Sequence, residues 1–230
     1  MIVSFDAIEV LVKPPYEITP EILNLVVSVS GKLGEINASH LVKQDPLLRR
    51  ANRIKTIHST LEIEGNTLSL EQITAIFEKK RVIGPRKEIL EVQNAIEVYD
   101  SIDSFNPKIK KDFLKAHKLL MSDLVDGNGK YRASGVGIVT GNKVSHLAPP
   151  PNMVPQLMDD LFGYLKKSKE TVLIKSCVFH YEMEFIHPFM DGNGRMGRLW
   201  QSLILGIDYP IFKYLPIETI VKQKQKEYYS

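Results

Sequence analysis

The sequence has little cysteine and no long apolar run, and both shortages narrow the classes of protein to which it can belong. Cys177 is the single cysteine among 230 residues, so no disulfide can form within the chain and a reducing compartment is favoured. No stretch approaches the roughly 20 apolar residues of a membrane-spanning helix. The first thirty residues include Asp6, Glu9 and Lys13, which a secretory signal would not. We therefore expect a cytoplasmic protein without a membrane partner.

A strong excess of charge of one sign is also absent. The chain has 30 basic and 27 acidic residues and a formal net charge of +3. Because nucleic-acid binding depends on many contacts to phosphate, this balance indicates no nucleic-acid partner, and any anion site must be local. Internal repeats and low-complexity tracts are missing too. With 43% apolar and 25% charged residues, the chain has the composition of an ordinary globular protein with a sizeable core.

Helix-capping patterns predict a mainly α-helical fold. Residues 19–20 and 45–46 each place an N-cap residue before a proline at the first helical position. The second of these helices is expected to run towards Glu64, where Gly65-Asn66 is a typical left-handed stop. Further helices are expected after Gly84-Pro85, after Asn106-Pro107, and over residues 153–165, 172–186 and 195–205.

One stretch predicts β-structure instead. Val136 to Val139 and Lys143 to Leu147 are rich in β-branched residues and flank the turn sequence Thr-Gly-Asn. Three consecutive prolines at residues 149–151 then end the stretch. The pattern is typical of a small β-hairpin over residues 136–147.

The segment from His187 to Arg198, HPFMDGNGRMGR, carries the residues of a phosphate-transfer site. Gly192 and Gly194 permit a tight turn whose N–H groups point inward as an anion nest. The helix that follows adds its N-terminal dipole and free amides. Arg195 and Arg198 are three positions apart, so both can face the same site and clamp a polyphosphate.

Two further side chains supply a metal ligand and a base. Asp191 is a hard oxygen ligand suited to Mg²⁺, or Mn²⁺, that phosphates already hold. His187 precedes the loop and is able to take a proton from an attacking hydroxyl. Each feature alone is commonly structural, since a histidine before a proline and a Gly-Asn-Gly turn are both ordinary. Their occurrence together within twelve residues favours phosphate chemistry.

A calcium-binding loop is the nearest alternative, because Asp191 to Gly194 begins like one. It fails because Arg195 occupies the fifth position and Ser202 the position of the bidentate glutamate. A second Asp-Gly-Asn-Gly sequence at residues 126–129 fails in the same way and lacks the histidine and the arginine pair. We interpret that second copy as a plain turn.

Here the sequence resembles a known family. Residues 187–198 match the Fic-domain signature HxFx(D/E)GNGRxxR at every specified position, and about residues 45–229 look family-like. The resemblance implies a mainly α fold, with a Fic-type helical core, a small β-hairpin flap and an N-terminal helical extension. It also implies a protein adenylyltransferase that transfers AMP from Mg-ATP to a Ser, Thr or Tyr hydroxyl of a target protein. The Doc-type phosphotransferase branch is similar but has a lysine at the position of Gly194, so this chain resembles the nucleotidyl-transfer branch.

The resemblance also implies a role for each matching residue. His187 is the expected base, Asp191 the metal ligand and Phe189 the anchor of the loop in the core. The expected anion hole is formed by Gly192, Asn193 and Gly194. Arg195 is expected to hold the inner phosphates, and Arg198 the γ-phosphate. Tyr229, next to Tyr228, resembles one of a pair of tyrosines near the adenine pocket of some relatives.

A segment N-terminal to the loop resembles a regulatory part of the family. Residues 60–65, TLEIEG, resemble the inhibitory-helix motif (S/T)xxxE(G/N). Glu64 is expected in the last helical turn, where the macrodipole disfavours an anion, so a cation beside it would be favourable. The resemblance supplies Arg198 as that cation, and Thr60 lies one turn earlier on the same face. The expected result is autoinhibition in cis, and the alternative is an ordinary helix end.

The hairpin has a resemblance of its own. Residues 130–132, the hairpin and the prolines resemble the Fic flap, whose exposed edge would pair with a target segment and present a hydroxyl to His187. The residues expected to bind the target are Val136, Gly137, Ile138 and Val139. A plain surface hairpin is the alternative.

These features predict an organisation and a set of partners. The chain divides into an N-terminal helical region over residues 1–100 with the inhibitory helix at about 46–65, a catalytic core over 101–218, and the start of a truncated C-terminal helix over 219–230. The expected partners are ATP and a target protein, and a homo-oligomer is compatible with the sequence. The alternatives are removal of AMP from a target, transfer of another phosphate-linked group, and a catalytically silent nucleotide-binding regulator.

Overall fold

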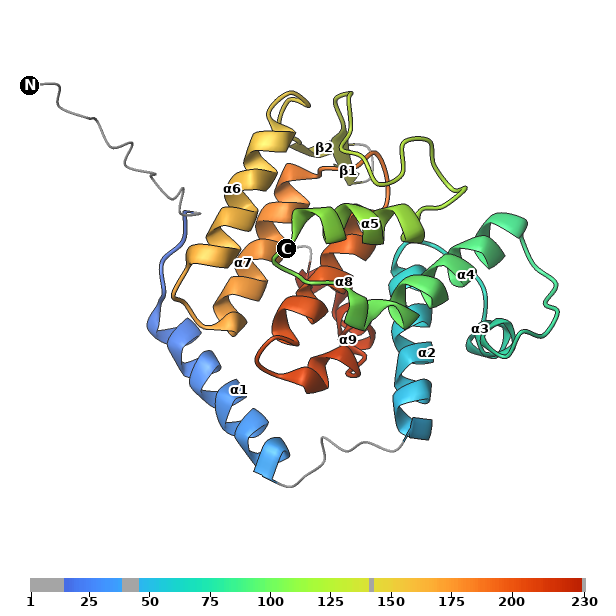
Figure 1. Ribbon diagram of the computed structural model, residues 1–230, viewed down its shortest axis with the longest axis horizontal. Helices are drawn as coiled ribbons and strands as arrows, with labels where there is room; N and C mark the ends of the chain where they lie inside the picture. The colour runs from blue at the N-terminus through green and yellow to red at the C-terminus, as the bar shows by residue number, and fades with distance from the viewer. Residues whose placement is uncertain (1–14, 39–45, 141–142, 229–230) are drawn as a thin grey trace, which may run out of the picture.

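Helices dominate the computed structural model, as the capping patterns predict. The described residues are 15–38, 46–140 and 143–228, and in this part of the chain one two-stranded sheet accompanies the helices (Figure 1). The helices are α1 (Pro20–Ala38), α2 (Pro46–Ile63), α3 (Leu70–Phe77), α4 (Arg86–Asp100), α5 (Lys110–Leu120), α6 (Val154–Lys167), α7 (Val172–Ile186), α8 (Asn193–Leu205), α9 (Ile217–Gln223) and α10 (Gln225–Tyr228). The short 3-10 helices are η1 (Ile102–Ser104) and η2 (Pro210–Lys213), and the strands are β1 (Gly137–Thr140) and β2 (Lys143–Leu147). No described helix combines the length and the apolar character of a bilayer span.

Aromatic rings fill the centre of the molecule, where α5, α7 and α8 meet. Phe113 of α5 is fully buried and meets the rings of Phe179 and Trp200 edge-on, the latter at 5.0 Å between centroids. The same apolar core continues through Ile57 of α2 and Val92 of α4. The expected inhibitory helix therefore shares one core with the helices that flank the signature loop. How the chain divides into domains stays a prediction.

The end of α2 is fixed by the hydrogen bonds of a Schellman motif. The Asn66 N–H donates to the Leu61 carbonyl at 3.0 Å, and the Gly65 N–H donates to the Glu62 carbonyl at 3.1 Å. Gly65 has a φ of +90°, a conformation that favours glycine. The helix stop predicted at Gly65-Asn66 is confirmed, and it places Glu64 directly after the last helical residue.

α9 packs along α2 and encloses a buried carboxyl beside it. The hydroxyls of Ser59 and Thr219 lie 3.1 Å apart across this contact. Glu218 is 2% exposed and accepts a hydrogen bond from the Tyr99 hydroxyl at 3.4 Å. The C-terminal helix, expected from residue 219, begins at Ile217 and is interrupted before α10. The packing of α9 against α2 therefore helps to fix the position of the C-terminal end of α2.

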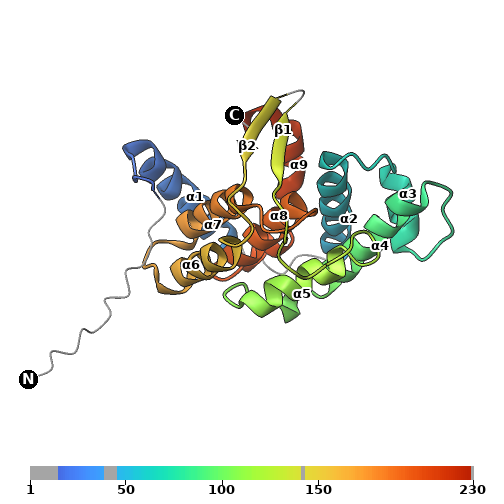
Figure 2. The same cartoon turned by 90° about the horizontal axis from the view of Figure 1, so that it is seen from above.

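The hairpin pairs β1 with β2 in antiparallel orientation. Gly137 lies opposite Leu147 and Ile138 opposite His146, and the register shifts after Ile138. β1 begins one residue later than Val136, the predicted start. In Figure 2 the two strands project beyond the layer of helices.

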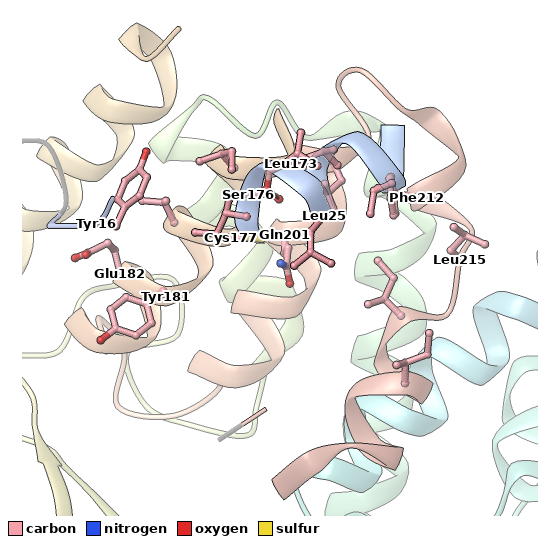
Figure 3. Close-up of a pocket in the computed structure, with 18 of the residues that line it drawn as sticks. Tyr16, Leu25, Leu173, Ser176, Cys177, Tyr181, Glu182, Gln201, Phe212 and Leu215 are labelled. Atoms are coloured by element: carbon pink, nitrogen blue, oxygen red, sulfur yellow. Dashed lines mark hydrogen bonds between the residues drawn. The ribbon is translucent and has the colours of Figure 1, made fainter. Parts of the chain in front are cut away.

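A largely apolar cavity of about 1100 Å³ lies between α1 and the face formed by α7, α8 and α9 (Figure 3). Leu25 and Val26 of α1 line one side, and Leu173 and Ile174 of α7 line the other. The lining includes none of residues 187–198. This cavity is therefore distinct from the signature loop.

The carboxyl of Glu218 is expected to make stability depend on pH. Burial raises its pKa to about 7 from an ordinary value of 4.5, so between these pH values the folded state holds a proton that the unfolded state has lost. The contribution of Glu218 to stability therefore falls as the pH rises through this window and does not change further above it. Glu218→Gln removes the titrating group and retains an acceptor for Tyr99.

In urea denaturation we expect Glu218→Gln to match the wild type at pH 4.5. At pH 8 we expect its free energy of unfolding to exceed that of the wild type by about 1–3 kcal/mol. The same difference at both pH values would contradict the assignment.

Candidate active site

α7 ends at Ile186, and its C-cap is His187, the residue predicted to be the base. The His187 N–H donates to the Met183 carbonyl at 2.9 Å, but its backbone is left-handed, with a φ of +50°. This conformation is uncommon for a residue that has a Cβ, and Pro188 follows it directly. The half-buried His187 is thus the first residue of the loop rather than the last residue of the helix.

Phe189 and Asn193 close the loop. Phe189 is fully buried, and its ring stacks on that of His117 with centroids 3.6 Å apart, so it anchors the loop in the core as predicted. The Asn193 carboxamide is buried; it accepts from the Phe189 N–H and donates to the Phe189 carbonyl, both at 2.9 Å. The side chain of Asn193 is thus engaged with the loop backbone, a role that the signature does not reveal.

His117 of α5 braces the loop from the core. Its Nδ1 accepts from the Gly129 N–H at 2.8 Å, which leaves Nε2–H to donate to the Asp191 carbonyl at 3.0 Å. Burial lowers the pKa of His117 to about 4, so the ring is neutral near pH 7, as this pair of bonds requires. The second Asp-Gly-Asn-Gly sequence, predicted to be a plain turn, therefore positions the histidine that supports the first.

The first turn of α8 is open to an anion. Gly192, directly before it, has a φ of +83°, and a Cβ there would lie 2.7 Å from the Met121 sulfur. No side chain caps this turn within the described part of the chain, so its N–H groups and the helix dipole can bind an anion. At the edge of the turn, Asp191 accepts from the Gly192 N–H at 2.5 Å and from Arg195 Nη2 at 3.1 Å.

Arg198 meets the residues that the inhibitory-helix resemblance implies. Its side chain is 3% exposed; Nε donates to Thr60 Oγ1 at 2.9 Å and Nη2 donates to the Thr60 carbonyl at 3.2 Å. Nη2 also donates to Glu64 Oε1 at 2.6 Å. Arg198 thus makes one charge-assisted contact with Thr60 and Glu64, which lie 138 and 134 positions before it in the sequence.

The absence of a side chain at Gly194 allows the Glu64 carboxylate to lie close to α8. A Cβ on Gly194 would lie 2.6 Å from Glu64 Oε1 and 3.1 Å from Arg198 Nη1. Any side chain at this position would therefore displace the carboxylate or the arginine. Oε1 of Glu64 therefore lies beside the open first turn of α8, where an anion is favoured.

Arg195 is connected to the end of α2 through residues that the sequence analysis missed. Its side chain is 5% exposed, and its Nη1 lies 3.8 Å from Glu91 Oε1. The other oxygen of Glu91 accepts from Asn66 Nδ2 at 2.8 Å. Asn66 is part of the helix stop that follows Glu64, so both arginines of the signature are linked to the same turn. No sequence pattern distinguishes Glu91 from other glutamates of α4.

Glu184 of α7 is a further carboxyl near Arg198. It packs on Gly197, where any Cβ would collide with its Oε1. Burial raises the pKa of Glu184 to about 7, while Arg198 opposes this shift and Glu64 adds to it. Among the described residues, its Oε1 has no hydrogen-bond partner. The field at Arg198 is therefore set by more than one carboxyl.

Two predicted parts of the site have no described side chains. Tyr229 lies outside the described residues, whereas the neighbouring Tyr228 hydroxyl makes a hydrogen bond with His180 of α7. The side chains of residues 137–147 are also outside the described part. Adenine binding by Tyr229 and target binding by the hairpin stay predictions.

Asn193→Ala tests the closure of the loop. The substitution removes the partners of the Phe189 N–H and carbonyl, and each buried group left unpaired costs about 1–3 kcal/mol. We expect urea denaturation to show a loss of about 2 kcal/mol or more in the free energy of unfolding. Asn128→Ala is the matched control in the second Asp-Gly-Asn-Gly sequence, where the carboxamide makes one bond of 3.4 Å to the Met121 carbonyl. Equal losses in the two variants would show that Asn193 does not hold the loop.

Comparisons with known protein sequences identify relatives of this chain. A model described as the Fic/DOC family matches residues 107–205. A protein adenylyltransferase Fic from Drosophila erecta is 30% identical over 219 residues, which cover 88% of this chain and 41% of the relative. A protein of the same name from Culex quinquefasciatus is 30% identical over 202 residues, which cover 81% and 38%. The chain thus spans about two fifths of the length of these curated relatives.

A solved structure extends the similarity to the architecture. A Fic family protein from Desulfovibrio desulfuricans G20 is 51% identical to this chain and superimposes on it with a TM-score of 0.87. The match covers 94% of this chain and 67% of that chain. Sequence and fold therefore agree over most of both molecules, and this chain belongs to the Fic family.

Proposed function

We propose that this chain is a protein adenylyltransferase, which transfers AMP from ATP to the hydroxyl of a serine, threonine or tyrosine in a target protein. The observation that carries the proposal is the anion site at the start of α8. There the buried Arg198 donates to the Glu64 carboxylate beside the open first turn of the helix, in the place that a phosphate group would take. The names of the curated relatives, protein adenylyltransferase Fic, support the same activity.

In the proposed reaction, the target hydroxyl attacks the α-phosphorus of ATP in line. A bond forms between the hydroxyl oxygen and the α-phosphorus, and the bond from that phosphorus to the oxygen shared with the β-phosphate breaks. Pyrophosphate leaves with the bonding electron pair, and His187 takes the proton of the hydroxyl. Arg195 and the first amides of α8 would stabilise the charge on the phosphate oxygens. The target is left with AMP in a phosphodiester linkage.

Asp191 fits a metal ion that is held mainly by phosphates. Its side chain is 46% exposed, so it can reach a ligand while Oδ1 stays bonded to the loop. No group of three or more side chains able to hold a metal occurs among the described residues. A single carboxylate binds Mg²⁺ or Mn²⁺ weakly alone but suits an ion that ATP brings with it. When bound, the ion would neutralise charge on the leaving pyrophosphate.

Glu64 would hold the enzyme inactive in cis. Arg198 donates to it at 2.6 Å, and the γ-phosphate of ATP needs the same guanidinium. Two anions brought to one buried cation also repel each other strongly, because the protein interior screens charge poorly. ATP can therefore take its productive position only when Glu64 moves away from Arg198.

Glu64→Gly is expected to raise AMP incorporation by about 10–100-fold. The reason is that a charge-assisted hydrogen bond, worth about 1.5–3 kcal/mol, no longer competes for Arg198. Folded wild type and variant are incubated with ATP labelled at either the α- or the γ-phosphate. Transfer of AMP labels protein from the α position alone, and transfer of a phosphoryl group labels it from the γ position alone. Equal incorporation by both proteins would mean that Glu64 is an ordinary helix end.

Two control variants separate catalysis from the docking of α2. Glu62→Ala removes a carboxylate from the same helix, but one that pairs with Lys222 of α9; we expect much less activation from it. His187→Ala in the Glu64→Gly background should lower AMP transfer by about 10²–10⁴-fold, the usual contribution of a positioned base. Absence of label from both forms of ATP in the Glu64→Gly protein would favour a silent nucleotide-binding regulator.

A further inference from the structure

Arg132 is a buried cation at the start of the segment that leads to the hairpin. It is 4% exposed. Its Nε donates to the His187 carbonyl at 2.8 Å, and Nη2 donates to the Ile186 carbonyl at 3.3 Å. Its main-chain N–H donates to the Pro188 carbonyl at 2.9 Å. One residue therefore holds three consecutive carbonyls where the signature loop begins.

The same guanidinium holds both ends of the hairpin segment. Nη1 donates to the Ser134 carbonyl at 2.9 Å, and Nη2 donates to the Pro149 carbonyl at 2.5 Å. Between these points the Ala148 N–H donates to the Val136 carbonyl at 3.3 Å and closes the base of the hairpin. Because the guanidinium is planar and rigid, these bonds couple the base of the hairpin to the start of the loop while they are intact.

The charge of Arg132 is solvated by main-chain carbonyls, and this fixes the conformation of the backbone around it. Its side-chain hydrogen bonds within the described part of the chain go to main-chain carbonyls. A buried cation that is solvated by carbonyl dipoles is stable only if those dipoles stay in place. Without them, the free energy lost when the cation was removed from water is no longer offset. The acceptors include the carbonyl of His187, whose backbone is left-handed. Arg132 thus stabilises a backbone conformation that a histidine does not prefer.

We propose that Arg132 is a positioning residue for the transfer reaction, because it fixes the main chain of His187 relative to strand β1. The proposal rests on the proposed function, in which β1 holds the target segment and His187 takes the proton from its hydroxyl. A displacement of about 1 Å between base and acceptor is enough to lower the rate by about 10²-fold. Lysine keeps the charge but lacks the planar fork of donors, so it cannot hold both sets of carbonyls.

The kinetic test is Arg132→Lys in the Glu64→Gly background. The rate of self-adenylylation is measured against ATP concentration, which gives kcat and the KM for ATP. We expect kcat to fall by about 10²-fold while the KM for ATP stays within about twofold, because the arginines of the phosphate site have other partners. Arg86→Lys, an exposed arginine at the start of α4, is the matched control and should change neither. An unchanged kcat, or a loss confined to KM, would overturn the proposal.

Hydrogen exchange of the same proteins distinguishes a failure of this proposal from a failure of the proposed function. In Arg132→Lys we expect amides in residues 134–140, 143–149 and 186–190 to exchange faster together, while those of α2 are unchanged. Arg132→Gln, which retains two N–H donors, is measured in parallel in case the lysine variant does not fold. If Glu64→Gly alone incorporates no AMP, the proposed function is wrong, and hydrogen exchange then decides the role of Arg132. Unchanged exchange in both segments overturns the positioning role, whatever the kinetics show.

Discussion

The guanidinium of Arg198 is the group on which the state of this protein depends. It is buried, so it needs an anion beside it, and two anions can serve: the Glu64 carboxylate or, in the proposed reaction, the terminal phosphate of ATP. Gly194 lets the carboxylate approach the first turn of α8, because a Cβ there would lie 2.6 Å from Glu64 Oε1. The helix stop at Gly65 and the packing of α9 on α2 matter for the same reason, because both determine where Glu64 lies.

The loop itself is held by a different set of groups. The Asn193 carboxamide, the neutral ring of His117 and the guanidinium of Arg132 all bind main-chain atoms of the loop. The conformation of the loop therefore does not depend only on Asp191 and Arg195, which bond to each other, and on the bond that Asp191 accepts from the Gly192 N–H. Charge stabilisation is most effective when the groups that supply it are already oriented. We therefore expect ATP binding to rearrange the end of α2 and to leave the loop largely as it is.

The sequence predicted best those features that depend on residues close together in the chain. Helix starts at prolines and the stop at Gly65 are local signals, and the signature loop lies within twelve residues. The contacts of His117, Glu91 and Arg132 were missed because their partners lie far away in the sequence. The flap resemblance includes Arg132 but does not reveal its bonds to the loop. Asn193 was expected in the anion hole, but its side chain braces the loop, which leaves its main-chain N–H for an anion.

Competition between Glu64 and the γ-phosphate for Arg198 is measured as a change in nucleotide affinity. Calorimetry with ATP and with AMP compares the wild type with Glu64→Gly, each with Arg198 intact or replaced by alanine. Competition for Arg198 predicts that Glu64→Gly tightens binding of ATP about tenfold more than binding of AMP, which lacks the γ-phosphate. It also predicts that this difference disappears in the Arg198→Ala proteins. An equal gain for both nucleotides, or a gain that survives Arg198→Ala, would show that Glu64 and the γ-phosphate do not compete for Arg198.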